Sequence, residues 1–142
     1  MYERRIEIRW ADLDAYGHVY NATYLTYLEM ARDEWLTSAL AVSPGKIWDY
    51  VVARVAIEYR RELRLAHRDI VASCRLADLG RTSITTREEI RTRDGRLAAE
   101  AEVVLVAING KRGVPRPLTD TERQALEASR ERSQGMREAP SA

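Results

Sequence analysis

The feature that most constrains this chain is a helical pattern, beginning near residue 21, that leaves little polar surface. Tyr24, Leu28, Ala31 and Trp35 follow the i, i+4, i+7, i+11 spacing of one buried helix face. The residues that widen this face are Leu25, Tyr27, Met30 and Leu36. The polar seam that remains consists of Thr26, Glu29 and Asp33. A helix that is apolar around most of its girth has to be covered by other structure, so we expect it to lie at the centre of the fold.

Strand patterns lie on both sides of this helix. Residues 3–10 alternate charged and bulky side chains, and residues 51–60 alternate again, with Val51, Val55 and Tyr59 on the apolar face. Further strands are expected at residues 70–76, 83–91 and 97–108. Asp94-Gly95 is a strong signal for the hairpin between the last two, because both residues tolerate a positive φ. One strand, a helix and then four strands predict an α+β fold with an antiparallel sheet.

The remaining segments mark breaks and the end of the domain. Pro44-Gly45 predicts a break after the helix, and Pro115 and Pro117 are expected to stop any strand. Thr119 to Glu122 forms a capping-box pattern for a short surface helix that ends near residue 133. Residues 134–142 are small and polar, and we expect them to be disordered. The prediction is a single domain over residues 1–133, followed by a tail at 134–142.

Composition narrows the classes of function. A chain of 142 residues is the size of one domain, and its net charge of +1 gives no support to general binding of nucleic acid or anionic membranes. The single cysteine, Cys74, cannot form an internal disulfide, which favours a reducing compartment. No window approaches the length of a membrane span, and the first residues, Met-Tyr-Glu-Arg-Arg, contain no apolar signal segment. We therefore expect a cytoplasmic protein.

A polar loop leads directly into the central helix. It contains Asp12, Asp14, Gly17 and His18, and Asn21 is a residue type that often caps a helix N-terminus. The first amides of a helix lack partners within the helix, and its N-terminal end carries partial positive charge. An acidic loop that runs into this end of a buried helix has the features of a functional site.

These residues carry a resemblance to a known family. Asp14-Ala15-Tyr16-Gly17-His18-Val19-Tyr20-Asn21, followed by Tyr24, Glu29 and Ala31-Arg32, resembles the D-x-x-G-H-V-x-N-x-x-Y-x-x-x-x-E-x-A-R signature of 4-hydroxybenzoyl-CoA thioesterase-like hotdog proteins. The likeness continues through Tyr59 and its basic run, Gly80-Arg81-Thr82-Ser83 and Asp94-Gly95, and covers residues 4–110. It implies a hotdog fold, in which the sheet wraps the central helix, and hydrolysis of acyl-CoA or acyl-carrier-protein thioesters. It also implies dimers whose sheets join edge to edge, and often tetramers.

The resemblance assigns the catalytic carboxylate to Asp14, which attacks the thioester carbonyl or activates a water. Amides at the helix N-terminus bind the developing oxyanion in this chemistry. The alternative for Asp14 is a loop residue that caps a turn, the commonest role of an aspartate in such a place. Asp12 is interpreted as structural, because only Asp14 has the family's offset from Gly17-His18.

The other candidate residues have catalytic roles, structural roles or both. His18 either assists at the carbonyl and the leaving thiolate or orders the loop through a hydrogen bond. Asn21 is expected to cap the helix through its side chain and to donate its amide to the oxyanion. Gly17 is expected to supply an unusual backbone angle. Tyr24 is expected to form part of the helix core or of the pocket wall. A second hotdog subgroup uses a helix carboxylate, which keeps Glu29 as a further candidate. Its alternative role is an ion pair with Arg32.

Basic residues are the candidates for recognising CoA phosphates, which arginine binds bidentately. They are Arg60, Arg61, Arg64, Arg68 and Arg81, with Arg81 in the segment that resembles the phosphate-proximal part of the family. Together with Tyr59, we select Arg61 and Arg81 as substrate-binding residues. The alternative for any one arginine is a solvated surface position. His67, in Leu65-Ala66-His67-Arg68, is interpreted as a turn residue.

The predicted function is thioester hydrolysis to a carboxylic acid and a free thiol. No metal or organic cofactor is expected, since Cys74 and two distant histidines make no ligand set. The alternatives are a hotdog hydratase or dehydratase, whose own motif is not found here, and a non-catalytic hotdog protein that binds acyl-CoA. The acyl group, and the choice between CoA and a carrier protein, are left open.

Overall fold

The computed structural model describes residues 1–42 and 49–138, and its helices and strands follow the expected order. The elements are β1 (Tyr2–Glu7), α1 (Asn21–Leu40), β2 (Tyr50–Tyr59), β3 (Asp69–Leu79), β4 (Ser83–Thr92), β5 (Leu97–Asn109), β6 (Val114–Pro115) and α2 (Asp120–Glu138). Short 3₁₀ helices lie at Trp10–Asp12 and Leu65–His67. The break predicted at Pro44-Gly45 lies outside the described residues.

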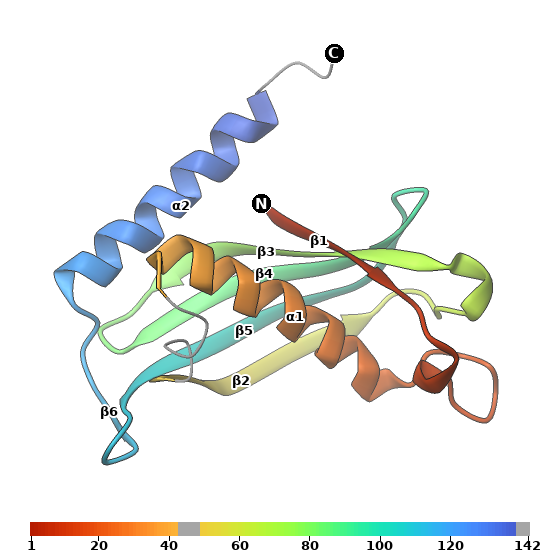
Figure 1. Ribbon diagram of the computed structural model, residues 1–142, viewed down its shortest axis with the longest axis horizontal. Helices are drawn as coiled ribbons and strands as arrows, with labels where there is room; N and C mark the ends of the chain where they lie inside the picture. The colour runs from red at the N-terminus through yellow and green to blue at the C-terminus, as the bar shows by residue number, and fades with distance from the viewer. Residues whose placement is uncertain (43–48, 139–142) are drawn as a thin grey trace.

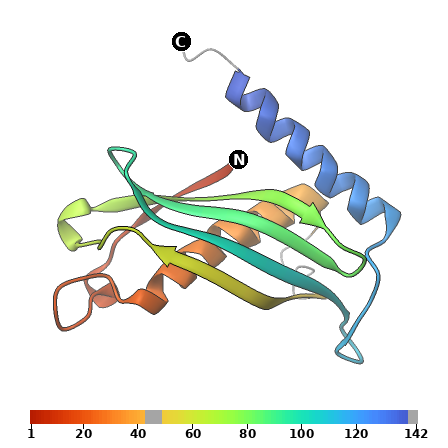
Figure 2. The same cartoon turned by 180° about the vertical axis from the view of Figure 1, so that it is seen from behind.

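One antiparallel sheet forms the body of the molecule. Its strands follow the order β1-β3-β4-β5-β2, and β6 pairs with β5 beside this path. Helix α1 lies across one face of the sheet (Figure 1), and the opposite face is uncovered when the molecule is seen from behind (Figure 2). The α+β prediction, with an antiparallel sheet around one long helix, is confirmed. No helix in the described part of the chain has an apolar stretch long enough to span a bilayer.

The helix packs on the sheet through the predicted stripe. Tyr24, Leu28, Ala31 and Trp35 are all buried, and Leu28 and Ala31 have no exposed surface. They meet inward-facing residues of the central strands, which include Ile70, Ile84, Ile90 and Val103. Exposed Thr26 and Glu29 lie on the outer seam. The helix therefore packs its apolar surface against the sheet and forms the centre of the core, as its sequence pattern predicts.

A buried ion pair joins the middle of α1 to the sheet. Arg32 donates from Nε and Nη2 to the two carboxylate oxygens of Glu88 on β4, at 2.9 and 3.1 Å. Thr86 donates to the same carboxylate at 2.6 Å. The predicted Glu29–Arg32 pair is wrong, because the Arg32 side chain points into the core and Glu29 faces outward. A local i, i+3 spacing could not reveal a partner that lies on a distant strand.

Two predictions for the end of the chain are wrong. Pro115 does not stop pairing, since Val114–Pro115 forms the two-residue strand β6 against Ile108 and Asn109. An edge position tolerates proline because it demands no amide there. Helix α2 begins at the predicted capping box but extends to Glu138 instead of ending near residue 133. Of the tail expected at 134–142, residues 139–142 lie outside the described residues.

Helix α2 is tied to the start of β2 through one carboxylate. Glu122 accepts both guanidinium nitrogens of Arg116, at 2.8 and 3.0 Å, and also the hydroxyl of Tyr50. Burial opposes the charge on Glu122, but the hydrogen bonds from Arg116, Tyr50 and Thr119 outweigh it and lower its pKa to about 2. This cluster anchors the connection after β6 at the end of the sheet opposite the helix N-terminus.

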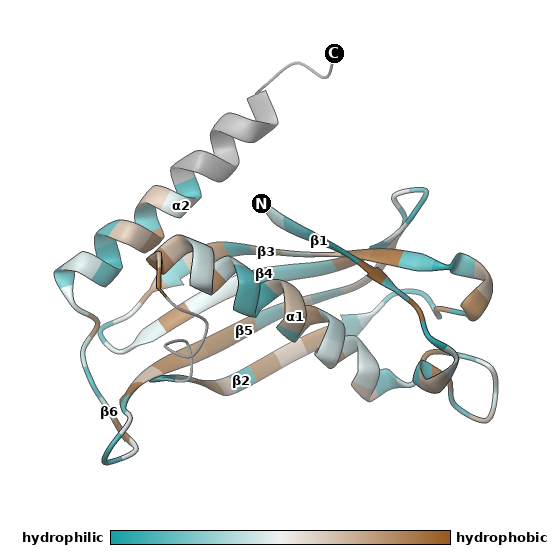
Figure 3. Cartoon of the chain, in the orientation of Figure 1, coloured by the Kyte–Doolittle hydropathy of each residue, from teal (hydrophilic) through white to brown (hydrophobic). Residues whose placement is uncertain are grey.

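Strand β2 departs most from the sequence expectation. Alternation predicts one apolar face, yet Val51, Val52, Val55 and Tyr59 are between 37% and 48% exposed. A β-bulge between Val52 and Arg54 also breaks the simple alternation. β2 is an edge strand, hydrogen-bonded to β5 on one side only within the described chain. Figure 3 shows hydrophobic segments along β2 and β5 at this side of the sheet.

Candidate active site

The acidic loop folds into a tight turn just before α1. The Asp14 amide donates to the His18 carbonyl at 2.7 Å, and the Gly17 amide donates to the Asp14 carbonyl at 3.1 Å. Leu13 and Val19 form an antiparallel bridge at its base. Gly17 has a φ of +79°, which a residue with a side chain rarely adopts. The expectation that Gly17 supplies an unusual backbone angle is confirmed.

The carboxylate of Asp14 both closes the turn and keeps one oxygen available. Its Oδ1 accepts the amides of Tyr16 and His18 at 2.8 and 3.1 Å. Within the described residues, Oδ2 accepts no hydrogen bond. The turn-capping interpretation of Asp14 is therefore correct as a description of Oδ1, and it fixes the direction of the side chain. A half-buried carboxylate held through one oxygen leaves the other free to meet a substrate or a water.

Asp12 has a different environment and is structural, as expected. Its side chain is 3% exposed and accepts the Tyr27 hydroxyl at 2.7 Å, together with the amide and guanidinium of Arg9. Burial raises the pKa of Asp12, but the hydrogen bonds from Arg9 and Tyr27 outweigh it, so the net shift is downward. Its carboxylate is fully engaged in holding the loop against α1.

The first turn of α1 presents free amide donors beside this loop. The N-cap is Tyr20, without a side-chain cap, and Asn21 is the first helical residue. The prediction that the Asn21 side chain caps the helix is wrong, because backbone bonds fix the entry instead: Tyr20 donates to the Asp12 carbonyl and Thr23 to the Tyr20 carbonyl. In the described chain, the amides of Asn21 and Ala22 donate to no acceptor. Two unpaired amides at a helix N-terminus form an anion-binding position.

His18 contacts a carboxylate that the sequence analysis did not select. Its Nε2 lies 2.9 Å from Oε2 of Glu62, and its side chain is about one-third exposed (32%). The two segments run side by side, since His18 and Arg64 form an antiparallel bridge and Val19 donates to the Leu63 carbonyl. His18 and Glu62 are distant in the sequence, so no local spacing predicts their contact.

Two tyrosines join the helix N-terminus to the end of β2. The ring of Tyr24 meets the ring of Tyr59 edge to face, with centroids 5.1 Å apart. The Tyr59 hydroxyl donates to the Asn21 carbonyl at 3.0 Å, and the Tyr24 hydroxyl to the Arg61 carbonyl at 3.1 Å. Tyr24 is 2% exposed and belongs to the core, whereas Tyr59 is 44% exposed. These contacts therefore hold the N-terminus of α1 against the end of the edge strand β2.

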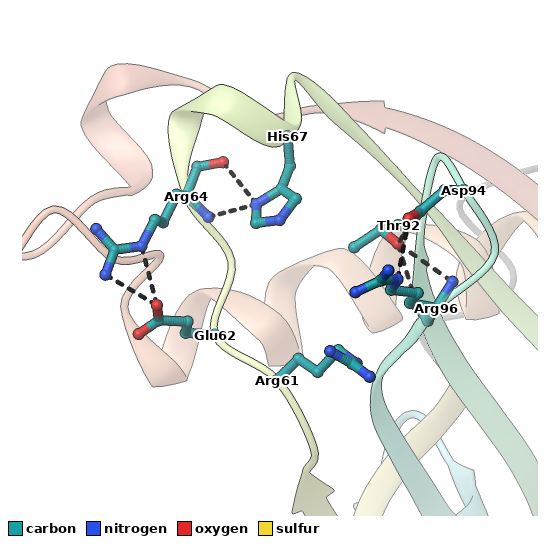
Figure 4. A pocket seen from close by; sticks show the side chains of 7 residues that line it. All are labelled: Arg61, Glu62, Arg64, His67, Thr92, Asp94 and Arg96. Atoms are coloured by element: carbon teal, nitrogen blue, oxygen red, sulfur yellow. Dashed lines mark hydrogen bonds and ion pairs between the residues drawn. The ribbon is translucent and has the colours of Figure 1, made fainter.

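A recess lies next to the loop, between the segment after β2 and the β4–β5 hairpin (Figure 4). Its volume is about 470 Å³, and its lining residues are Arg61, Glu62, Arg64, His67, Thr92, Asp94 and Arg96. Arg64 pairs with Glu62 and Arg96 with Asp94, whereas Arg61 has no carboxylate partner among the described residues. His67 accepts the Arg64 amide at 2.9 Å, which confirms its role as a turn residue.

Arg81 lies at the other end of the sheet. Tyr59 pairs with Ala99, whereas Ser83, two residues after Arg81, pairs with Val106. Seven positions along β5 correspond to roughly 23 Å. The structure of one protomer therefore groups Asp14, Gly17, His18, Asn21, Tyr24, Tyr59 and Arg61 at one end, and does not bring Arg81 to them.

Neither the site nor the rest of the described chain suggests a metal centre. Among the described residues, no three histidine, cysteine, aspartate or glutamate side chains are grouped so that they could hold a metal ion. Cys74 is buried in the core on β3, and burial, with the nearby charge of Glu88, raises the pKa of its thiol. The chemistry available at the site is that of a carboxylate, an imidazole and backbone amides.

Comparison with known proteins places this fold and loop in context. The chain is 31% identical to a thioesterase from Thermus thermophilus that was solved with coenzyme A and zinc, with a TM-score of 0.83 over 91% of this chain and 93% of that one. It is 28% identical over 117 residues to the acyl-CoA thioester hydrolase YbgC of Escherichia coli, which covers 80% of this chain and 86% of that protein. It is 29% identical over 111 residues to the long-chain acyl-CoA thioesterase FadM of Escherichia coli K12, covering 77% and 84%.

The family match spans nearly the whole described domain. The sequence pattern of the thioesterase-like superfamily matches residues 8–130, which include the acidic loop, the central helix and all strands from β2 to β6. The hotdog resemblance stated from the loop and helix residues is confirmed by this match. The chain belongs to the thioesterase-like superfamily.

Proposed function

We propose that the chain hydrolyses acyl-CoA thioesters, with Asp14 as nucleophile or general base. The observation that carries this proposal is a half-free carboxylate on a short loop that leads directly into the α1 N-terminus, where two amides donate to no acceptor in the described chain. A tetrahedral intermediate needs both a group that supplies or activates the nucleophile and donors for the oxyanion. Family membership supports the choice of a thioester as the substrate.

The loop geometry suggests how the reaction proceeds. Oδ2 of Asp14 attacks the carbonyl carbon or takes a proton from an attacking water, while the Asn21 and Ala22 amides bind the oxyanion. The carbon–sulfur bond then breaks, its electron pair stays on sulfur, and the thiolate takes up a proton. If Asp14 attacks directly, a water hydrolyses the acyl-enzyme anhydride in a second step. The N-terminal end of α1 stabilises the negative charge in either route.

The acyl group requires an apolar wall, which the protomer offers at β2. Val52, Val55 and Tyr59 point to the helix side of the sheet, because they pair in register with the inward residues of β5. They are nevertheless exposed. Strand β2 has ten residues and, within the described chain, its outer edge pairs with no other strand, so it invites pairing with a second copy. We therefore propose a two-fold dimer in which the β2 strands pair and cover these residues; a tetramer remains a prediction.

The same dimer gives Arg81 a place in substrate binding. Antiparallel pairing of two β2 strands sets the Tyr59 end of one protomer beside the Tyr50 end of the other. Arg81 lies at the Tyr50 end of its own sheet. The proposal assigns Arg81 of one protomer and Arg61 of the other to the phosphates of a CoA carrier, which arginine recognises well. Cytoplasmic location, expected from the sequence, is part of this proposal.

A turnover panel tests the proposed function. Purified protein is incubated with aromatic, short-chain and long-chain acyl-CoA, an enoyl-CoA and an acyl carrier protein thioester, and both the free thiol and the enoyl absorbance are measured. We expect thiol release, with a preference in kcat/KM that identifies the acyl group. A loss of enoyl-CoA absorbance without thiol release would indicate a hydratase. Calorimetric binding of acyl-CoA without turnover would indicate a non-catalytic binder.

A further inference from the structure

We propose that Glu62 is a positioning residue, which holds the His18 imidazole so that Nδ1 is the ring nitrogen that serves the substrate. This inference rests on the proposed function. It adds a residue that the loop sequence does not contain. Glu62 comes from the segment after β2, 44 positions beyond His18 in the chain.

The backbone fixes the two residues side by side. Val19 donates to the Leu63 carbonyl at 2.7 Å, and His18 and Arg64 form an isolated antiparallel bridge. Leu63 is completely buried, so this crossing is anchored in the core. The His18 amide also donates to Oδ1 of Asp14, which ties the imidazole-bearing residue to the candidate catalytic carboxylate.

The side chain of Glu62 is itself held from the far side. Arg64 places Nε and Nη2 at 2.9 and 2.8 Å from Oε1 of Glu62. Figure 4 shows this pair at the edge of the recess, with the Glu62 carboxylate beside the Arg64 guanidinium. The other oxygen, Oε2, is 2.9 Å from His18 Nε2. Glu62 thus bridges an arginine and the histidine, with one oxygen for each.

This arrangement selects one form of the imidazole. A lone pair on Nε2 at 2.9 Å from a carboxylate oxygen is repulsive, so Nε2 carries the proton. In the neutral ring Nδ1 is then the acceptor, and among the described residues it has no partner. Nδ1 can therefore take up a proton, either the one that Asp14 removes from the attacking water or, where Asp14 attacks directly, one from solvent. On cleavage of the carbon–sulfur bond, that proton moves from Nδ1 to the thiolate and the neutral ring is restored.

Nitrogen-15 NMR of the imidazoles tests the inference without relying on activity. The chain contains only two histidines, and His67 serves as an internal reference because its Nδ1 accepts the Arg64 amide. We expect the neutral His18 ring to be almost entirely the Nε2–H tautomer. In Glu62→Leu the two tautomers mix, whereas Glu62→Gln, whose amide oxygen still accepts, retains part of the preference. Identical His18 spectra in the wild type and Glu62→Leu would overturn the proposal.

Kinetics of the same variants complete the test. Glu62→Leu should lower kcat roughly tenfold with little change in KM, because mixed tautomers forfeit part of the contribution of a positioned general acid. The kcat of Glu62→Gln should lie between those of the wild type and Glu62→Leu. Glu127→Leu removes an exposed, ion-paired carboxylate on α2 and should leave kcat unchanged at an unchanged Tm.

A tautomer shift in Glu62→Leu with wild-type kcat would also overturn the proposal. A wild-type protein that releases no thiol from any thioester would instead refute the proposed function, so the wild-type rate separates the two failures.

Discussion

Replacing Glu88 by leucine leaves the Arg32 guanidinium buried without its carboxylate. Arg32 is 5% exposed and Glu88 1%, and the pair has two hydrogen bonds at 2.9 and 3.1 Å. Burial opposes the charge on Arg32, but the hydrogen bonds and attraction of Glu88 outweigh it and raise its pKa. Because the ordinary pKa of an arginine lies far above neutrality, Arg32 stays charged even when this partner is removed.

The expected cost follows from this burial. Removing one partner of a buried pair costs about 3–5 kcal/mol, because the remaining charge stays desolvated. For a chain of this size, that corresponds to a fall in Tm of roughly 6–20 °C. The double variant Arg32→Met/Glu88→Leu removes both charges, and its free energy of unfolding should lie within about 1 kcal/mol of the wild-type value.

Urea unfolding of the wild type, Glu88→Leu, Arg32→Met and the double variant at one protein concentration measures these free energies, since dimerisation makes stability depend on concentration. The difference between the double variant and the sum of the single variants gives the coupling energy. A loss below about 1 kcal/mol in Glu88→Leu, the range of a surface pair, would refute the reasoning.

Other predictions follow from the same contacts. Leu28→Ala should cost about 2–5 kcal/mol in urea unfolding, because Leu28 has no exposed surface, whereas exposed Thr26→Ala should cost less than about 0.5 kcal/mol; equal losses would contradict the central-helix packing. The Glu122 pKa of about 2 lies below its ordinary 4.5, so its stabilising contribution is complete above about pH 5 and is lost as the pH falls toward 2. Glu122→Gln should therefore flatten the dependence of unfolding free energy on pH in that window, and an unchanged slope would argue against the cluster. Val55→Lys places a charge on the proposed dimer edge, and light scattering across a dilution series should show a monomer; a wild-type monomer that is stable and active would refute edge pairing.

The sequence predicted those features that depend on local periodicity or on a composite motif. The stripe from Tyr24 to Trp35 and the positions of the main strands follow from side-chain spacing, and the structure confirms both. The Asp94-Gly95 hairpin and the positive φ of Gly17 follow from local backbone preferences. The family resemblance added what spacing could not, namely how the sheet wraps the helix.

The errors concern interactions between segments that are distant in the chain. Helix spacing predicts that Arg32 pairs with Glu29, while its partner Glu88 lies 56 positions away. Asn21 looked like a cap from its residue type, but hydrogen bonds from Tyr20 and Thr23 fix the helix entry. Glu62 gave no sequence signal as a partner of His18, because only the antiparallel bridge to Arg64 brings it there. Alternation in residues 51–60 predicts an apolar face but does not identify which strand lies at the edge, so it does not reveal that this face is exposed in β2.

The central claim is that Asp14 carries out thioester hydrolysis, and the kcat of matched loop variants tests it most directly. Asp14→Asn keeps the shape and can still accept the Tyr16 and His18 amides, whereas Asp12→Asn alters a neighbouring carboxylate that binds Arg9 and Tyr27. With the preferred acyl-CoA and a free-thiol readout, kcat of Asp14→Asn should fall by about 10²-fold or more with little change in KM. Asp12→Asn should lose stability and retain most of its kcat. Wild-type turnover in Asp14→Asn, or a greater loss in Asp12→Asn at equal folded fraction, would contradict the account.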